Sequence, residues 1–423
     1  MDFANHPCFN AEARHATARV HLPVAPKCNV QCNFCDRKYD CVNESRPGVT
    51  SSVLDPGAAV DYLESVLERI PNVAVVGIAG PGDPFANPEE TLETMERVGA
   101  KYPDKLLCLA TNGLGLPEYV DRVAALNVSH VTITLNAVDP EIGAKIYAWI
   151  RVGKKPYRGV EGAKVLLERQ LLAIRLLKEK GVTVKINTVV IPGINDDHVP
   201  EIARVAGALG ADVQNCIPLM HVEGTAFEGV PAPEAGAMQA MRFEAGKSLK
   251  QMSHCARCRA DAAGLLGQQN NEEIAALLAE AGRVKPTEER PRVAVATMEG
   301  LFVNRHLGEA PTLWIYEAEG EGVTGKPVLI EQRSTPIPGG GDGRWEALAE
   351  SLSDCFAVLV SGAGPSPERI LKARGVRVIA VEGLISDTVG ELLAGREIPK
   401  VLMRRAGACG AGSSCGGTGQ GCA

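Results

Sequence analysis

Residues 28–37 read CNVQCNFCDR and place Cys28, Cys32 and Cys35 in a C-x3-C-x2-C spacing. Iron–sulfur clusters are held by cysteine thiolates, usually four to a four-iron cluster. Three thiols in one short loop can hold three irons and leave the fourth open to a small molecule. The alternative is a structural zinc site closed by Cys41, although zinc sites usually combine cysteine pairs that lie well apart. We therefore expect a [4Fe-4S] cluster on this loop.

This spacing resembles the signature of the radical S-adenosylmethionine (SAM) enzymes. The resemblance implies that the amino and carboxylate groups of SAM chelate the open iron. It also implies that an electron from the cluster cleaves a carbon–sulfur bond of SAM.

Composition narrows the class of protein. The 423 residues predict two or three domains, and a hydrophobic content of 45% is ample for their cores. A net charge of −7 argues against a nucleic-acid partner. The chain has no apolar run long enough to span a membrane and no signal peptide at its start, so we expect no membrane partner and a cytoplasmic location. Thirteen cysteines in such a protein favour metal ligation over disulfides.

Strand-like and helix-like segments alternate between residues 21 and 219, which predicts parallel strands with right-handed helical crossovers. We expect an α/β fold with a partial (βα)6 barrel, as the radical SAM resemblance also implies. The predicted strands are 21–26, 73–79, 106–110, 130–136, 182–191 and 213–219. The predicted helices are 57–70, 88–99, 117–126, 161–180 and 197–209.

The rest of the chain divides into four parts. Residues 221–282 are expected to be mostly helical and to complete a first domain over 1–282. Residues 283–291 form a charged, proline-bearing linker, and 292–400 alternate strands and helices as a smaller α/β domain. The Gly- and Cys-rich tail, 401–423, cannot form a core of its own.

The carboxyl ends of the barrel strands carry candidate SAM contacts, because chemistry in such folds lies at that edge. Gly80, Gly82 and Asp83 follow a buried strand, where glycines permit close backbone approach to a ligand. The radical SAM resemblance implies SAM-amino contact there, although that superfamily often has Gly-Gly-Glu. An ordinary turn is the alternative reading. The further candidates, which are also common turn residues, are Asn112, Asn136 and Asn187.

Five more cysteines of the barrel portion can ligate metal, namely Cys8, Cys41, Cys108, Cys255 and Cys258. A lone Cys108 would ordinarily be core, and a lone C-x2-C pair would be half of a zinc site or a redox pair. With one histidine, these thiols suffice for two further clusters of three ligands each. One would use Cys8, Cys41 and a histidine, and the other Cys108, Cys255 and Cys258. The expected histidine is His6, with His15 and His21 as rivals and a surface position as the alternative.

Three long segments resemble the NifB family of nitrogenase-cofactor biosynthesis proteins: HPCFN at 6–10, LPVAPKCN at 22–29 and CDRKYDCVNESRPG at 35–48. The resemblance implies one SAM cluster and two [4Fe-4S] substrate clusters. The enzyme would fuse the substrate clusters, with a SAM-derived carbide and a sulfur, into the eight-iron precursor NifB-co. Cys8, Cys41 and Cys108 would hold substrate clusters, and Glu44 and Arg46 would have polar or proton-transfer roles. His221 and Glu223 are further candidates for such roles.

The same resemblance implies a mechanism and partners. One SAM methylates a cluster sulfide, and the 5′-deoxyadenosyl radical from a second SAM removes hydrogen from that methyl group. The expected partners are iron–sulfur cluster donors, a ferredoxin- or flavodoxin-type electron donor, and cofactor carrier or scaffold proteins.

The second domain resembles the NifX-type cofactor carriers at residues 293–297, 299–300 and 304–308. His306 is there either a cluster ligand or a structural turn residue. Cys409, Cys415 and Cys422 of the tail bind metal transiently, cover the site or are disordered, whereas Cys216 and Cys355 read as core.

Two other functions remain open at this point. One is a radical SAM enzyme with auxiliary clusters acting on an organic substrate or peptide. The other is an iron–sulfur scaffold or carrier without catalysis. Production of 5′-deoxyadenosine separates a radical SAM enzyme from a pure carrier.

Overall fold

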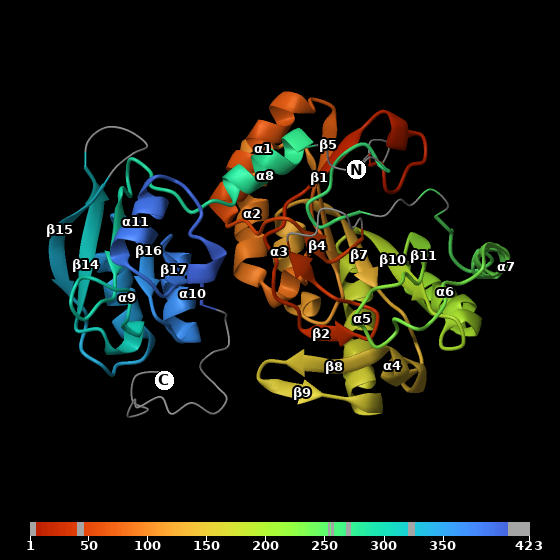
Figure 1. Ribbon diagram of the computed structural model, residues 1–423. Coiled ribbons are helices and arrows are strands. Elements are labelled where there is room, and N and C mark those ends of the chain that lie inside the picture. Colours follow the sequence, from red (N-terminus) through yellow and green to blue (C-terminus); the bar gives the residue numbers. More distant parts are fainter. Residues whose placement is uncertain are drawn as a thin grey trace. The chain divides into compact units, whose positions relative to one another are not determined.

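The computed structural model of the chain describes residues 6–39, 46–252, 254, 258–267, 272–319 and 326–404. The chain forms two compact units that divide between Gly282 and Arg283 (Figure 1). Each unit has its own sheet and its own hydrophobic core. None of the helices in the described ranges combines the length and apolarity that crossing a bilayer would require.

The first unit is built on a curled sheet with the strand order β11-β10-β7-β6-β5-β1-β12 (Figure 1). All neighbouring strands from β1 to β11 pair in parallel, and β12 pairs antiparallel with β1. The predicted partial (βα)6 barrel is therefore confirmed. The strands are β1 (Ala18–His21), β5 (Val73–Ile78), β6 (Leu106–Thr111), β7 (Val128–Thr134), β10 (Thr183–Val190), β11 (Val213–Pro218) and β12 (Ala263–Gly264).

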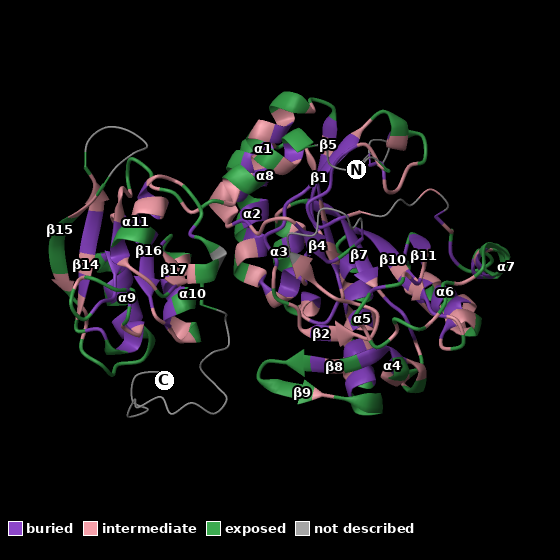
Figure 2. Cartoon of the chain, in the orientation of Figure 1, coloured by how far each residue is buried: buried purple, intermediate pink, exposed green. Residues whose placement is uncertain are grey.

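Helices cover the outer face of this sheet. Alternate strand residues such as Val76, Leu107 and Ile186 are buried in one core with helical residues such as Leu63 and Ile174 (Figure 2). Because side chains alternate across a strand, the residues between them point to the inside of the curve. The helices are α1 (Pro56–Arg69), α2 (Pro88–Lys101), α3 (Val120–Ala125), α4 (Pro140–Ile146), α5 (Gly159–Glu179), α6 (Val199–Ala208), α7 (Ala235–Ala245) and α8 (Glu272–Ala281).

Several helices begin where the sequence places a capping residue. The Asp55 carboxylate accepts a hydrogen bond from the Ala58 amide at 2.9 Å, and Pro56 occupies the first position of α1. Asp139 and Pro140 start α4 in the same way. These local signals explain why the predicted helix at 57–70 lies within one residue of α1.

Three sequence-based expectations were wrong. The first strand is not 21–26 but β1, because Ala18–His21 pair with β5 whereas residues 22–26 form no regular ladder. Residues 221–282 are not mostly helical: within the described residues they hold only α7 and α8, because loops and β12 occupy the stretch between those helices. The prediction also missed α4 and the hairpin of β8 (Tyr147–Val152) and β9 (Lys155–Tyr157).

The hairpin belongs to a small sheet of order β2-β8-β9, in which β2 is Val30–Cys32. Its strands are too short and too exposed to show a clear alternation of polar and apolar residues. A further two-stranded sheet joins β3 (Lys38–Tyr39) to β4 (Val49–Thr50).

The second unit is a five-stranded sheet of order β15-β14-β13-β16-β17 with helices on both faces. Ala294, Ile315 and Val358 pack in one core with α9 and α10, whereas Val293 and Leu359 pack in another with α11. The elements are β13 (Arg292–Val295), β14 (Thr312–Ala318), β15 (Pro327–Ser334), α9 (Asp342–Ser351), β16 (Cys355–Val360), α10 (Pro365–Ala373), β17 (Arg377–Ala380) and α11 (Ile385–Leu393).

Candidate functional site

Polar and thiol side chains line the inner face of the first sheet. The register places Cys108 of β6 between Gly77 of β5 and His130 of β7. Lys185 of β10 pairs with Thr132, two residues beyond His130 on β7. This face therefore gathers chemistry-bearing residues that lie far apart in the sequence.

The Cys108 thiol has room because its neighbour is a glycine. A Cβ atom on Gly77 would stand 2.7 Å from Cys108 Sγ and 3.3 Å from the His21 ring. Burial, and to a lesser extent the thiol of Cys8, raise the pKa of the Cys108 thiol to about 12, with Lys185 lowering it and Cys258 raising it. The thiols of Cys8 and Cys258 are therefore near enough for their charges to act on Cys108, and Cys108 is only partly buried.

The N-terminal segment folds onto this face. His6 is 1% exposed, and its ring centroid lies 4.3 Å from that of His130. The Lys185 ammonium stands 5.3 Å from the Phe9 ring centroid. Burial, and then the charges of His130 and Lys185, hold the pKa of His6 well below its usual value. His6 is therefore a neutral imidazole at pH 7, the form that binds metal.

The two rival histidines differ in position. His21 is buried at the end of β1, its Nδ1 lies 3.0 Å from the Arg259 carbonyl oxygen, and burial lowers its pKa to about 4. His15 is exposed, and its Nε2 accepts a hydrogen bond from Arg14. His6 and His21 therefore lie beside the thiols, and His15 does not.

The segment with Cys258 is held against β1 and β4. Arg19 Nη2 donates to Cys258 Sγ at 3.2 Å, and its Nη1 donates to the Leu265 carbonyl at 2.8 Å. Asp261 bonds the Arg259 guanidinium at 2.7 Å and the Ser51 amide at 2.8 Å.

We call the six residues that meet here the inner-face cluster: His6, Cys8, Cys108, His130, Lys185 and Cys258. The predicted ligands Cys41 and Cys255 and the predicted Glu44 lie outside the described residues.

The loop with the three cysteines is closely packed. Burial raises the pKa of Cys28 to about 11 and holds that of Cys32 well above its usual value. Burial also raises the pKa of Cys35, although the charges of Arg37 and Arg46 oppose it. These thiols are protonated at neutral pH, so iron binding must displace their protons.

The Arg46 side chain binds the backbone of the cysteine loop. It is 5% exposed, and its Nη1 donates to the Asp36 carbonyl at 2.7 Å, next to Cys35. The polar or proton-transfer role of Arg46 stays a prediction, and in the structure its guanidinium binds the backbone next to Cys35.

The segment Gly80–Asp83 is clamped to the stem of the cysteine loop. The amides of Gly82 and Asp83 donate to the carbonyls of Ala25 and Lys27 at 2.6 and 2.8 Å. A Cβ atom on Gly82 would stand 2.0 Å from the Lys27 carbonyl oxygen, so no side chain fits there.

The Asp83 carboxylate joins two strand ends. It is 2% exposed and accepts hydrogen bonds from the Thr111 hydroxyl at 2.9 Å, the Asn112 amide at 2.6 Å and the Phe85 amide at 2.9 Å. The sequence suggested that this carboxylate binds SAM. In the structure the carboxylate accepts hydrogen bonds from groups of the protein itself, and these bonds hold the ends of β5 and β6 together.

The three predicted asparagines have different surroundings. Asn112 Nδ2 donates to Asn29 Oδ1 at 2.7 Å and lies 3.7 Å from Cys28 Sγ. Asn136 is fully buried, and its Oδ1 accepts from the Val189 amide at 2.9 Å. Asn187 is half-buried on β10 and accepts from Asn215 at 3.2 Å. Only Asn112 directly contacts the cysteine loop among these three.

The comparisons with known proteins identify both units. Residues 22–206 match the Radical SAM superfamily, and residues 289–395 match the family Dinitrogenase iron-molybdenum cofactor. The chain is 52% identical to the FeMo cofactor biosynthesis protein NifB of Chlorobaculum tepidum over 100% of this chain and 99% of the relative. The chain belongs to the NifB family. It is also 39% identical to the NifB of Azotobacter vinelandii, over 88% of this chain and 84% of the relative.

Solved structures show weaker likeness. SuiB of Streptococcus suis aligns with a TM-score of 0.41 at 13% identity, over 56% of this chain and 49% of that one. Methylornithine synthase PylB aligns with a TM-score of 0.37 at 17% identity, over 62% of this chain and 70% of that one.

Membership of the NifB family makes this chain a radical SAM enzyme of FeMo cofactor biosynthesis. The superfamily implies a [4Fe-4S] cluster and SAM. The donor set fits that cluster, because three partly buried thiols share one loop and the charge of Arg37 favours their thiolate forms.

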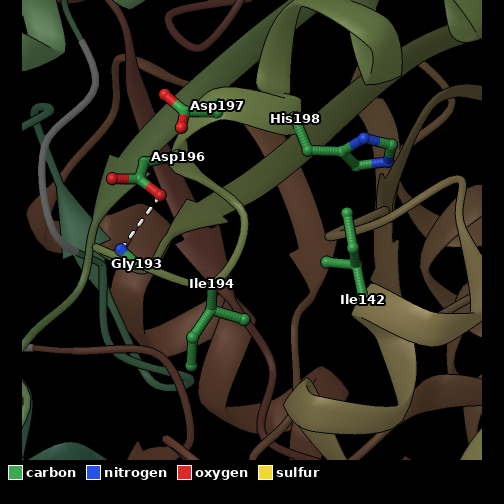
Figure 3. A pocket seen from close by; sticks show the side chains of 6 residues that line it. All are labelled: Ile142, Gly193, Ile194, Asp196, Asp197 and His198. Atoms are coloured by element: carbon green, nitrogen blue, oxygen red, sulfur yellow. Dashed lines mark hydrogen bonds between the residues drawn. The ribbon is translucent and has the colours of Figure 1, made fainter.

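One pocket and several predicted residues fall outside the sites described above. A pocket of about 320 Å³ lies between α4 and the loop after β10, and none of the predicted site residues lines it (Figure 3).

Over the described ranges, no group of three or more His, Cys, Asp or Glu side chains is arranged to hold a single metal ion. His221 and Glu223 are exposed loop residues. In the second unit, His306 Nδ1 accepts from the Gly308 amide at 3.1 Å and caps a short turn.

Sequence reasoning missed Arg19, His130 and Lys185. A signal was available, because polar residues recur at alternate positions on otherwise apolar parallel strands, as Thr183, Lys185 and Asn187 do on β10. Cys216 and Cys355 are buried, as predicted.

Proposed function

We propose that this chain builds the eight-iron NifB-co by fusing two [4Fe-4S] substrate clusters on the inner face of its barrel. The observation that carries the proposal is the inner-face cluster. This face carries three thiols, from the N-terminus, β6 and the segment after α7, together with a neutral His6. A single catalytic [4Fe-4S] cluster on the cysteine loop would need none of these ligands.

Cys28, Cys32 and Cys35 would hold the SAM cluster, which supplies reductive cleavage of SAM when bound. Gly80 and Gly82 would let backbone approach SAM, and Asp83 and Asn112 would hold that loop against the cysteines. Asn136 and Asn187 remain proposed SAM contacts from the neighbouring strand ends.

Cys8, Cys108, Cys258 and His6 would ligate the substrate clusters, together with Cys41 and Cys255. Cys8, Cys41 and His6 would hold one cluster, and Cys108, Cys255 and Cys258 the other. Lys185 would balance the negative charge that thiolate-bound clusters bring to this face.

The chemistry would use two SAM molecules. One transfers its methyl group to a cluster sulfide and leaves as S-adenosylhomocysteine. The other takes one electron and yields methionine and a 5′-deoxyadenosyl radical, which removes a hydrogen atom from the methyl group and leaves as 5′-deoxyadenosine. The two remaining hydrogens would leave as protons, with Glu44 as the proposed acceptor. The carbon–sulfur bond would then break, the irons of the two substrate clusters would supply the electrons that reduce the carbon to carbide, and the fused product would also take up one sulfur.

The second unit would hold the product for delivery to carrier or scaffold proteins, with His306 as a proposed ligand. Cluster donors and a ferredoxin- or flavodoxin-type electron donor are further proposed partners, and a cytoplasmic location suits such oxygen-sensitive clusters. Deletion of 292–423 should then lower product retention, and unchanged retention would contradict the carrier role.

Iron content and SAM products of the anaerobically reconstituted protein test the main proposal. Wild type should hold about twelve irons and form both S-adenosylhomocysteine and 5′-deoxyadenosine, whereas Cys108→Ala should lose about four irons, one cluster. Cys216→Ala is the matched control, because Cys216 is a buried β11 residue of the core packed with the helices, and its thiol donates to Gln251 Oε1 at 3.3 Å. Only about four irons in wild type, with Cys108→Ala silent, would contradict cluster fusion. Absence of 5′-deoxyadenosine would instead indicate a pure carrier.

A further inference from the structure

The β8–β9 hairpin and the residues that flank it carry a concentration of positive charge. Between Glu141 and Glu161 the chain has five basic residues and no acidic one. All five are exposed, and we call them the hairpin patch: Lys145, Arg151, Lys154, Lys155 and Arg158. The whole chain has a net charge of −7, so this patch runs against the average charge of the molecule.

The charges of the hairpin patch are not neutralised within the described part of the chain. Basic residues elsewhere on the surface pair with acids, as Lys101 does with Glu64 at 2.8 Å. In the patch, Arg151 Nε donates to the Gly153 carbonyl at 3.0 Å and the Lys155 ammonium lies over the Tyr157 ring at 4.3 Å. No patch residue forms an ion pair with another described residue.

The hairpin is also directly bonded to the loop with the three cysteines. Strand β8 pairs with β2, which places Tyr147 opposite Cys32 (Figure 1). The Arg151 amide donates to the Asn29 carbonyl at 2.8 Å, and the Asn33 amide donates to the Ile146 carbonyl at 2.9 Å. A protein seated on the hairpin would therefore lie against the backbone that carries Cys28, Cys32 and Cys35.

We propose that the hairpin patch docks an acidic one-electron carrier protein, which reduces the cluster on the cysteine loop. The inference rests on the proposed function, because it needs that cluster. The step moves one electron: the carrier is oxidised by one electron, the [4Fe-4S] cluster is reduced from 2+ to 1+, and no atom is transferred.

Charge complementarity selects this class of partner. A compact patch of like charge raises the association rate of an oppositely charged protein by roughly ten- to a thousandfold, and salt removes the gain. SAM carries a positive sulfonium, so the patch would not attract it. A donor of substrate clusters would serve the inner-face cluster, whereas the hairpin pairs with the cysteine loop.

Binding to the full chain without clusters tests the docking surface independently of activity. The probes are a bacterial ferredoxin with two [4Fe-4S] clusters and, separately, a flavodoxin. The variant Lys154→Glu/Lys155→Glu should bind at least one of the two carriers about tenfold more weakly than wild type at about 0.01 M salt, and the difference should vanish near 1 M salt. The matched control is Lys326→Glu/Arg374→Glu, which changes the net charge equally on exposed residues of the second unit and should bind like wild type.

Reduction kinetics of the loaded protein complete the test. The reduced carrier should reduce the double variant about tenfold more slowly than wild type, whereas the neutral photoreductant 5-deazaflavin should reduce all proteins equally. Wild-type binding and reduction by both carriers in Lys154→Glu/Lys155→Glu would overturn the docking proposal. Failure of wild type to form 5′-deoxyadenosine with 5-deazaflavin would overturn the proposed function instead.

Discussion

Two glycines set how closely the functional groups of this enzyme approach one another. Gly77 leaves the space that the Cys108 thiol occupies, and Gly82 lets the Gly80–Asp83 segment lie directly on the Lys27 carbonyl. Neither position has a strained left-handed φ value, so close packing and not backbone conformation demands glycine there.

Gly82→Ala should displace the cysteine loop, because the added Cβ would stand 2.0 Å from a backbone oxygen that cannot rotate away. We expect loss of about four irons, those of the SAM cluster, with the circular dichroism spectrum retained. Gly236→Ala is the control, since a Cβ at that exposed helical position meets nothing within 4 Å. Full iron content in Gly82→Ala would show that the clamp does not position the cysteines.

Lys185 is a cation on the buried inner face, beside His6 and Cys108. Lys185→Met keeps the length of the side chain and removes its charge, so Tm should fall little or rise. Retention of substrate clusters should fall, while SAM cleavage at the cysteine loop continues. Iron content and 5′-deoxyadenosine yield measure the two effects, and Lys185→Arg should restore much of the retention. Normal product formation in Lys185→Met would exclude a role for this charge.

At the scale of elements, Asp354, which directly precedes β16, links that strand to β15 and β13 of the second unit through hydrogen bonds. Its carboxylate accepts from Arg333 of β15 at 2.6 Å and from Arg292 of β13 at 2.7 Å. The Arg333 guanidinium, and then Arg292, hold the pKa of Asp354 well below its ordinary value of 3.8. The folded state therefore favours the charged carboxylate.

Asp354→Asn should destabilise the second unit by about 1 kcal/mol at pH 7, since the pair is partly exposed to solvent. Because the folded pKa is depressed, the contribution of Asp354 is complete above its ordinary value of 3.8 and is lost as pH falls toward the folded value. Urea unfolding from neutral to strongly acidic pH measures this, and the difference from wild type should shrink on acidification. Asp342→Asn, which removes an exposed ion pair with Arg369, should have a smaller effect. Equal effects of both variants at all pH values would contradict the network.

At the scale of the whole molecule, each unit buries its own core, and the predicted SAM ligands all belong to the first. Deletion of 283–423 should leave a folded protein that still cleaves SAM, as measured by 5′-deoxyadenosine formed with 5-deazaflavin. Loss of SAM cleavage in a deletion variant that retains its circular dichroism spectrum would show that the second unit takes part in the chemistry.

The sequence by itself determined the features that depend on neighbours along the chain. The C-x3-C-x2-C loop, the capped start of α1 and the alternation of strands and helices are local patterns, so the barrel and the second α/β fold could be predicted. The assigned roles of the individual site residues stay predictions, and those of Cys41, Cys255 and Glu44 lie outside the described residues.

Only the tertiary structure decided which residues share a face. The pairing of β5, β6, β7 and β10 brings Gly77, Cys108, His130 and Lys185 together. Long-range contacts of the same kind let the Asp83 carboxylate join the ends of β5 and β6 by hydrogen bonds. They also pair the basic β8–β9 hairpin with the cysteine loop. Sheet register and curvature follow from the packing of the whole barrel, and no spacing within a single segment encodes them.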